Sequence, residues 1–194
     1  MHLFAAAVTK IFNPVFTAFV TAILAISVQQ ISVSAKVLLA IVTFFVAALP
    51  AAVLYYQYKK GKVSSLWSPK GAERRNAYIA WVLLASVASL AAFYFEAPRL
   101  IVALGLVFLA LGVVNLLLAS TFKISVHMEL VTVMVITAIL AVSVELFYLV
   151  LLLPLVAWSR FYLKAHDITE ITIGTFLTIT IIYFIFSFFG LATF

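Results

Sequence analysis

The chain has 194 residues, of which 67% are hydrophobic and 9% are charged, and its mean hydropathy is +1.29. A soluble domain carries about 25% charged residues, so this composition excludes an ordinary soluble protein, and the high hydrophobicity excludes intrinsic disorder. The absence of cysteine excludes a disulfide scaffold, a thiolate nucleophile and a zinc site built on cysteine. The net charge is +6, and its basic residues lie between apolar segments. That pattern favours an anionic lipid headgroup or an anionic substrate over nucleic acid.

Long apolar segments dominate the chain. A transmembrane helix needs about 20 mostly apolar residues to cross about 30 Å of hydrocarbon. The segments predict seven spans, at 13–28, 37–56, 77–95, 100–119, 128–143, 146–161 and 171–191. Residues 128–161 are divided because one helix of that length would measure about 51 Å, and polar residues cluster at 143–145. We expect an all-α polytopic transmembrane helix bundle of six to seven spans, in a single domain covering 1–194.

Prolines and glycines refine these spans. Pro14 is placed to begin the first helix, since proline is tolerated in a first turn. Pro50 and Pro154 lie inside the second and sixth spans and predict kinks. Gly105 and Gly112 in the fourth span predict close helix packing.

Basic residues are distributed unequally between the two sides of this bundle. Seven spans place the termini on opposite sides, and the loops after the second, fourth and sixth spans then share the N-terminal side. That side holds Lys10, Lys59, Lys60, Lys62, Lys70, Arg74, Arg75, Lys123, Arg160 and Lys164. The other side holds Lys36 and Arg99. Because an excess of Lys and Arg marks the cytoplasmic side, we expect a multi-pass protein of the cell membrane with these loops in the cytoplasm.

Two histidines lie in loops of the cation-rich side, each close to a cation, a hydroxyl and a carboxylate. Ionisable groups at membrane depth are costly and indicate a functional site. The first cluster reads Lys123-Ile124-Ser125-Val126-His127-Met128-Glu129. The second reads Ser159-Arg160, then five residues, then His166, then three residues and Glu170.

The spacing within both clusters suits phosphoryl chemistry. His166 and Glu170 are four residues apart and share a face if a helix begins near His166. The carboxylate can then accept from one ring nitrogen and leave the other free as a nucleophile. Arg160 offers a planar guanidinium to phosphoryl oxygens. Ser125 precedes a helix N-terminus, where free N–H groups favour an anion, and His127 is placed to act as a general acid.

These clusters resemble signatures of the type 2 phosphatidic acid phosphatase superfamily. The second cluster is similar to its third signature, Ser-Arg-x5-His-x3-Asp, with Glu170 in place of Asp. The first cluster is similar to a reduced form of its second signature, Pro-Ser-Gly-His, with Ile124 and Val126 in place of Pro and Gly. The first signature, Lys-x6-Arg-Pro, corresponds less closely to the segment 70–76, which has a different spacing and no proline.

The resemblance implies a membrane phosphatase that hydrolyses a phosphate monoester or diphosphate of a lipid, of the polyprenyl diphosphate or phosphatidate and phosphatidylglycerophosphate type. His166 would attack phosphorus and form a phosphohistidine, Glu170 would hold its tautomer, and His127 would protonate the leaving oxygen. The phosphoryl oxygens would be neutralised by Arg160, Ser125, Lys123, Lys70, Arg74 and Arg75. No metal and no other cofactor is implied, because the cations supply the electrostatic stabilisation.

Two other interpretations remain open. In the first, the protein is a non-catalytic polytopic membrane protein whose charges are structural, and His166 and Glu170 only begin a helix. In the second, His127, Glu129, His166 and Glu170 hold a divalent ion in a metal-dependent membrane enzyme or transporter. The cations beside these residues disfavour the second interpretation, because they would repel a metal ion.

Overall fold

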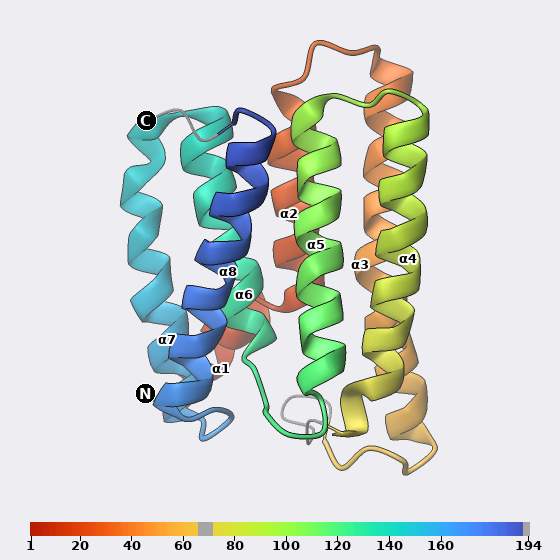
Figure 1. The fold of residues 1–194 in the computed structure, drawn as a ribbon. Coiled ribbons are helices and arrows are strands. Elements are labelled where there is room, and N and C mark those ends of the chain that lie inside the picture. The colour runs from red at the N-terminus through yellow and green to blue at the C-terminus, as the bar shows by residue number, and fades with distance from the viewer. Residues whose placement is uncertain (66–71, 192–194) are drawn as a thin grey trace.

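A computed structural model describes residues 1–65 and 72–191, and within this part of the chain it contains helices and no strand (Figure 1). The α-helices are α1 (His2–Ile11), α2 (Pro14–Ser27), α3 (Val33–Lys59), α4 (Arg75–Tyr94), α5 (Arg99–Leu118), α6 (Val126–Thr137), α7 (Leu152–Tyr162) and α8 (Ile168–Phe188). Three shorter turns of other helix types complete the set: η1 (Ala72–Arg74), the π-helical η2 (Ala138–Val142) and the 3₁₀-helical η3 (Val144–Leu151).

The helices long and apolar enough to cross a membrane number five within the described residues: α3, η1 with α4, α5, η3 with α7, and α8. The pair α1 and α2, bent by 46°, adds a sixth if it forms one span. Helix α6 with η2, Val126–Val142, is apolar but shorter. The expected all-α polytopic bundle is therefore confirmed, whereas the fifth of the seven predicted spans is not long enough to count as a full span.

The long apolar segment 128–161 is broken at the polar residues 143–145, the place where the sequence predicted a division. Helix α6 continues into η2, which ends at Val142, and Ser143 then adopts an extended conformation with φ −163° and ψ 137°. The Ser143 hydroxyl accepts a hydrogen bond from the Glu145 backbone N–H at 3.2 Å, which begins η3. The division of this segment into two elements is confirmed.

Helix α1 was absent from the sequence expectation, which began the first helix at residue 13. The chain breaks between α1 and α2 at Asn13, whose side chain accepts from the Phe16 backbone N–H at 3.0 Å and caps α2. Pro14 occupies the first turn of α2, as expected. Helix α3 continues through Pro50 without a break. Pro154 lies in the first turn of α7.

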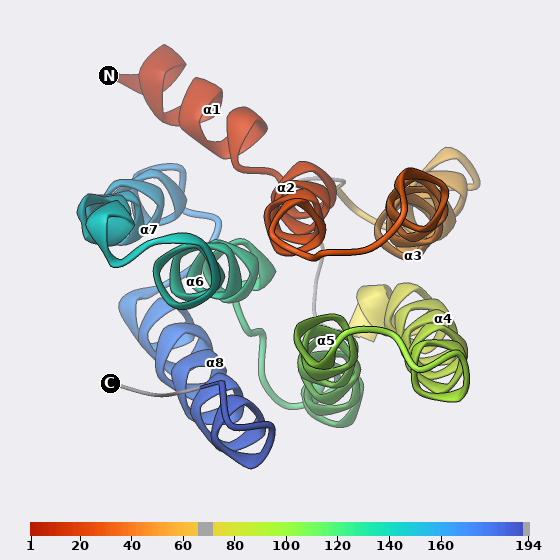
Figure 2. The ribbon, with the colours of Figure 1, turned by 90° about the horizontal axis from the view of Figure 1, so that it is seen from above.

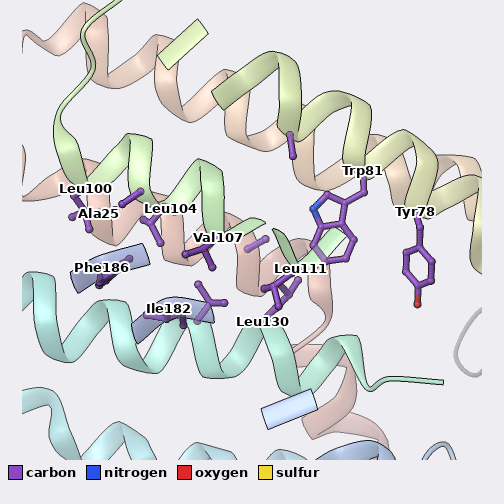
Figure 3. Close-up of a cluster of buried hydrophobic side chains, with 14 of the residues drawn as sticks. Ala25, Tyr78, Trp81, Leu100, Leu104, Val107, Leu111, Leu130, Ile182 and Phe186 are labelled. Atoms are coloured by element: carbon purple, nitrogen blue, oxygen red, sulfur yellow. The ribbon is translucent and has the colours of Figure 1, made fainter. Parts of the chain in front are cut away.

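Helix α5 anchors the core of the bundle. Its side chains Leu104, Val107 and Leu111 belong to a buried cluster with Ile182 and Phe186 of α8 (Figure 3). Seen from above, α6 lies among α2, α7 and α8, whereas α3 lies at the edge beside α2 and α4 (Figure 2). Helix α3 has no fully buried residue, so it forms an outer wall of the bundle.

The close packing predicted for the two glycines of α5 is confirmed. A Cβ atom at Gly105 would lie 2.8 Å from the Ser89 hydroxyl oxygen of α4. One at Gly112 would lie 3.4 Å from the ring of Trp81. These short distances show that α4 and α5 lie close together at both glycines, as small residues allow at helix interfaces in membranes.

Candidate active site

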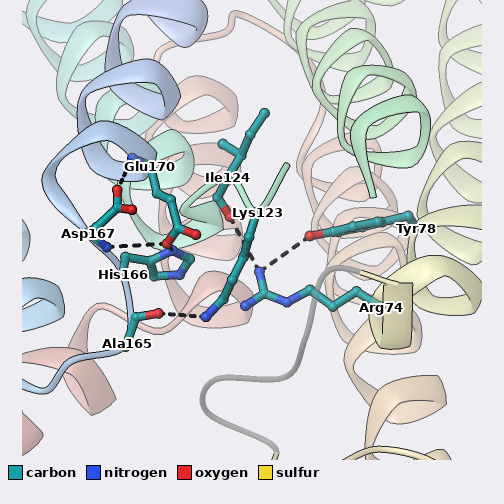
Figure 4. Close-up of polar contacts among 8 residues, drawn as sticks. All are labelled: Arg74, Tyr78, Lys123, Ile124, Ala165, His166, Asp167 and Glu170. Carbon is teal, nitrogen blue, oxygen red and sulfur yellow. Dashed lines mark hydrogen bonds and ion pairs between the residues drawn. The ribbon is translucent and has the colours of Figure 1, made fainter. Parts of the chain in front are cut away.

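The loops that carry the predicted site residues lie at the same end of the bundle, near the N-terminus (Figure 1). Two hydrogen bonds join them across the fold. The Lys123 ammonium donates to the Ala165 carbonyl at 2.7 Å, and the Arg74 guanidinium donates to the Ile124 carbonyl at 3.4 Å (Figure 4). Three segments that are far apart in the sequence therefore meet at one place.

His166 is held in position by the start of α8. Asp167 caps this helix, because its carboxylate accepts from the Glu170 backbone N–H at 2.8 Å and the Glu170 carboxylate accepts from the Asp167 backbone N–H at 3.3 Å. The same Glu170 oxygen lies 2.7 Å from Nδ1 of His166 (Figure 4). A reciprocal capping box thus orients the carboxylate that orients the imidazole, and the contact expected from the four-residue spacing is confirmed.

The His166 ring is buried among positive charges. Its side chain is 1% exposed. Burial, and then the charges of Arg74, Arg160 and Lys123, lower the pKa of His166 to about 2. The ring is therefore neutral at physiological pH. Its Nδ1 faces the Glu170 carboxylate, and the ring also hydrogen-bonds to the Lys123 backbone. With its proton on Nδ1, the ring has a lone pair on Nε2. A neutral imidazole in this tautomer is a competent nucleophile.

Three cations converge on this imidazole from different elements. Arg160, in the last turn of α7, is 1% exposed, and Arg74, at the end of η1, is 7% exposed. Arg74 also donates to the Tyr78 hydroxyl at 3.4 Å. Burial and the nearby charge of Arg74 lower the pKa of Lys123 below its ordinary value. Cations this close repel one another, so the arrangement is suited to an anion that lies between them.

Ser125 and His127 begin α6 beside these cations. Ser125 occupies the N-cap position, but its side chain makes no capping hydrogen bond. Its hydroxyl and Nε2 of His127 are buried and have no hydrogen-bond partner in the part of the chain that the structure describes. The same holds for Nε of Arg74. Buried polar atoms are almost always paired, so these three unpartnered atoms point to a polar ligand.

Helix α8 reaches the Ser125 segment because it carries a glycine at the crossing. A Cβ atom at Gly174 would lie 3.1 Å from the Ile124 side chain and 3.4 Å from the Ser125 carbonyl oxygen. The missing side chain allows the helix that carries Glu170 to lie directly against the segment that carries Ser125.

One predicted phosphate ligand does not join this cluster, and a second falls outside the residues that the structure describes. Arg75 is exposed at the first residue of α4. Lys70 lies outside the described residues. Of the two neighbouring arginines that the sequence could not separate, Arg74 is the one in the site.

The metal interpretation finds no matching arrangement. Glu129 is buried away from the histidines, where both of its carboxylate oxygens accept from the Asn115 amide, at 2.8 and 3.0 Å. Within the described residues no group of three or more His, Asp or Glu side chains is placed to hold a metal ion.

A hydrophobic cavity of about 370 Å³ adjoins the site. Arg74, His127 and Arg160 are among its lining residues. The remaining wall is mostly apolar and comes from α2, α3, α4, α5 and α6, with Ala18, Val46, Ala47, Leu54, Trp81, Phe108 and Leu130 among its residues. The cavity therefore joins an apolar volume to the cation cluster.

Sequence reasoning missed Thr9, Tyr78 and Asn115. Thr9 shares a hydrogen bond with Ser159, Tyr78 contacts Arg74, and Asn115 holds Glu129. Only Asn115 carried a signal, because an amide inside an apolar span needs a buried partner.

No protein-family model matches the chain, and no curated protein or solved structure matches it. The resemblance to the type 2 phosphatidic acid phosphatases therefore rests on the residues of these clusters alone.

Proposed function

We propose that the protein is a metal-independent membrane phosphatase that releases phosphate from a lipid phosphate monoester or diphosphate through a phosphohistidine. One observation carries the proposal: the neutral imidazole of His166 is held by a carboxylate and lies beside buried cations. A nucleophile and an anion site occupy the same place, which is the minimum that metal-free phosphoryl transfer to a side chain requires.

A phosphoryl group fits the unsatisfied side of this site. Its oxygens accept hydrogen bonds, which Ser125 Oγ and Arg74 Nε, two of the atoms without a partner, are able to donate, and which the third, His127 Nε2, donates when its ring is protonated. Arg160, which lines the cavity, adds a planar guanidinium. The developing charge of the transition state is then stabilised by fixed cations without any reorganisation of water.

The reaction follows from these positions. Nε2 of His166 attacks phosphorus, the bond from phosphorus to the leaving oxygen breaks, and His127, which enters this step as the protonated imidazolium, gives its Nε2 proton to that oxygen. Neutral His127 then takes a proton from water, whose oxygen attacks the phosphohistidine. The P–N bond breaks, inorganic phosphate leaves, and His166 regains its neutral form. Glu170 stabilises the ring while it carries positive charge.

The cavity favours a lipid substrate over a soluble phosphate ester. Arg74 and Arg160 line a cavity whose wall is mostly apolar, so a phosphate bound at these cations would have hydrophobic space beside it for its leaving group. A polyprenyl diphosphate and a phosphatidate or phosphatidylglycerophosphate both have this form. We place the enzyme in the cell membrane, with the site end of the bundle toward the cytoplasm.

Phosphate release by the purified protein, with EDTA present, tests the proposal. The lipids to compare are phosphatidate, phosphatidylglycerophosphate and a polyprenyl diphosphate, with glycerol phosphate as the soluble control. We expect His166→Ala to abolish release and His2→Ala, at the exposed N-terminus, to leave it unchanged. Near-normal turnover of His166→Ala would contradict the mechanism. Activity lost with EDTA and restored by magnesium or zinc would favour the metal-dependent alternative.

A further inference from the structure

Helix α1 is fastened to α7 one residue away from a site arginine. Ala5, Val8 and Thr9 form its buried side, and α1 packs against α7. The Ser159 hydroxyl donates to the Ala5 carbonyl at 2.7 Å and lies 2.6 Å from the Thr9 hydroxyl. A serine hydroxyl has one hydrogen, and Ala5 takes it, so Thr9 is the donor in the second bond. The donor and acceptor roles of the Thr9 and Ser159 hydroxyls are thereby assigned.

The backbone of Thr9 makes a second contact with the site. The last four carbonyls of a helix have no partner further along the same helix, and α1 ends at Ile11. The Lys10 carbonyl is satisfied by the Asn13 amide at 2.8 Å. The Thr9 backbone instead hydrogen-bonds to the ring of His127. Because Nε2 of that ring has no partner within the described residues, the bond belongs to Nδ1.

We propose that Thr9 is a positioning residue that aligns His127 and Arg160 for phosphoryl transfer, an inference that rests on the proposed function. Its hydroxyl fixes the rotation of the last turn of α7 through Ser159, the neighbour of Arg160. Its carbonyl accepts from Nδ1–H of His127 and so keeps Nε2 directed at the cavity, where His127 is a lining residue. Thr9, which lies outside the three predicted clusters, therefore positions two residues that belong to them, Arg160 and His127.

Thr9→Val removes the hydroxyl and keeps the shape of the side chain. We expect kcat to fall about tenfold, the effect of losing one buried hydrogen bond, with KM changed less than twofold, because Thr9 is not a lining residue of the cavity. Thr9→Ser restores the hydroxyl and should recover most of kcat. Thr21→Val is the matched control, since the buried Thr21 hydroxyl donates only to the Thr17 carbonyl of its own helix.

Nitrogen NMR of the imidazole rings gives a readout that does not depend on activity, since the chain has only three histidines. We expect Thr9→Val to shift the His127 signals and to leave those of His166 in place. Unchanged kcat and unchanged His127 signals in Thr9→Val would overturn the positioning role, as would an equal loss of kcat in Thr21→Val. If the unmodified protein released no phosphate from any lipid, the proposed function would fail, and a His127 shift would then support only the contact.

Discussion

Arg74 and Arg75 are consecutive residues with identical side chains, but the fold gives them different environments. Arg74 ends η1, where its guanidinium is buried and donates to Tyr78 and to the Ile124 carbonyl. Arg75 begins α4 and is exposed. A helix turns by about 100° per residue, so neighbouring side chains point in different directions. Arg74 therefore belongs to the site, whereas Arg75, its immediate neighbour in the sequence, is a surface charge.

We expect Arg74→Met to lower kcat about 100-fold, the cost of removing one group that stabilises the transition-state charge. Arg75→Met removes the same charge one residue later and should change kcat less than twofold. Phosphate release from the preferred lipid measures both. Equal losses in the two variants would show that the effect comes from the net charge of the loop and would contradict the assignment of Arg74.

The buried neutral imidazole of His166 predicts a dependence of stability on pH. An unfolded histidine binds a proton below about pH 6.5, whereas burial and the surrounding cations keep His166 unprotonated in the folded protein down to about pH 2. The unfolded state binds more protons in this window, so the free energy of unfolding falls as pH falls below about 6.5, by up to about 1.4 kcal/mol per unit.

This slope is measured by thermal unfolding in detergent at about pH 7.5, 6.5 and 5.5, values that bracket the ordinary histidine pKa of about 6.5. His166→Gln cannot titrate and should reduce the slope, and His2→Gln, at an exposed position, should not. The comparison between these two variants removes the contribution of other groups that titrate in the same range. Identical slopes would contradict the depressed pKa of His166.

At the scale of single residues, the sequence could predict only contacts between residues that are close together in the chain. The contact between His166 and Glu170 follows from their spacing and from the helix that begins beside them. The contacts of Arg74 with Ile124 and of Thr9 with Ser159 join residues that are 50 and 150 positions apart. Such contacts depend on how helices pack, and no local pattern encodes them.

Helix α8 crosses the segment before α6 at short range in the site, and Gly174 makes this crossing possible. Ile124 and the Ser125 backbone occupy the space that a side chain at position 174 would take. A branched side chain there has to push the start of α6 away from α8. The distance between Glu170 and Ser125 depends on this contact, and with it the fit of a phosphoryl group in the proposed site.

We expect Gly174→Val to lower kcat at least about tenfold, because overpacking of this kind costs about 1–3 kcal/mol. Thr175→Val is the control at the next position, where the hydroxyl bonds only to the Ile171 carbonyl of its own helix. That variant should retain activity within about twofold of the unmodified protein, a change of less than about 0.5 kcal/mol. Full activity of Gly174→Val would show that the crossing does not determine the geometry of the site.

Apolar segments predicted most of the helices but not how many of them cross a membrane. Ten residues of α6, from His127 to Thr137, are buried, so this helix is apolar because it lies inside the bundle. A short apolar stretch is ambiguous between a span and a core helix, and hydropathy does not separate the two. Helix α1 escaped prediction for the opposite reason, since its ten residues are too few for a span and bury only three side chains.

On the scale of the whole molecule, the site end and the opposite end differ in charge. The loops after α3, α5 and α7 lie at the end that holds the N-terminus, and the turns from α2 to α3 and from α4 to α5 lie at the other (Figure 1). Lys59, Lys60, Lys62 and Lys164 lie at the site end without forming part of the cation cluster. Lys36 and Arg99 lie at the other end. This asymmetry favours a cytoplasmic site end.

Single cysteines test both the shared end and its orientation, because the chain has no native cysteine. Lys62, Lys164 and Gln30 are exposed positions, the first two at the site end and the third in the turn between α2 and α3. In intact cells an impermeant thiol reagent should label Gln30→Cys and spare Lys62→Cys and Lys164→Cys, and after lysis it should label all three. The reverse pattern would place the site outside the cytoplasm and leave the shared end intact. Opposite accessibility of Lys62→Cys and Lys164→Cys would separate Arg74 from His166 across the membrane, and neither the bundle nor the active site could then be as described.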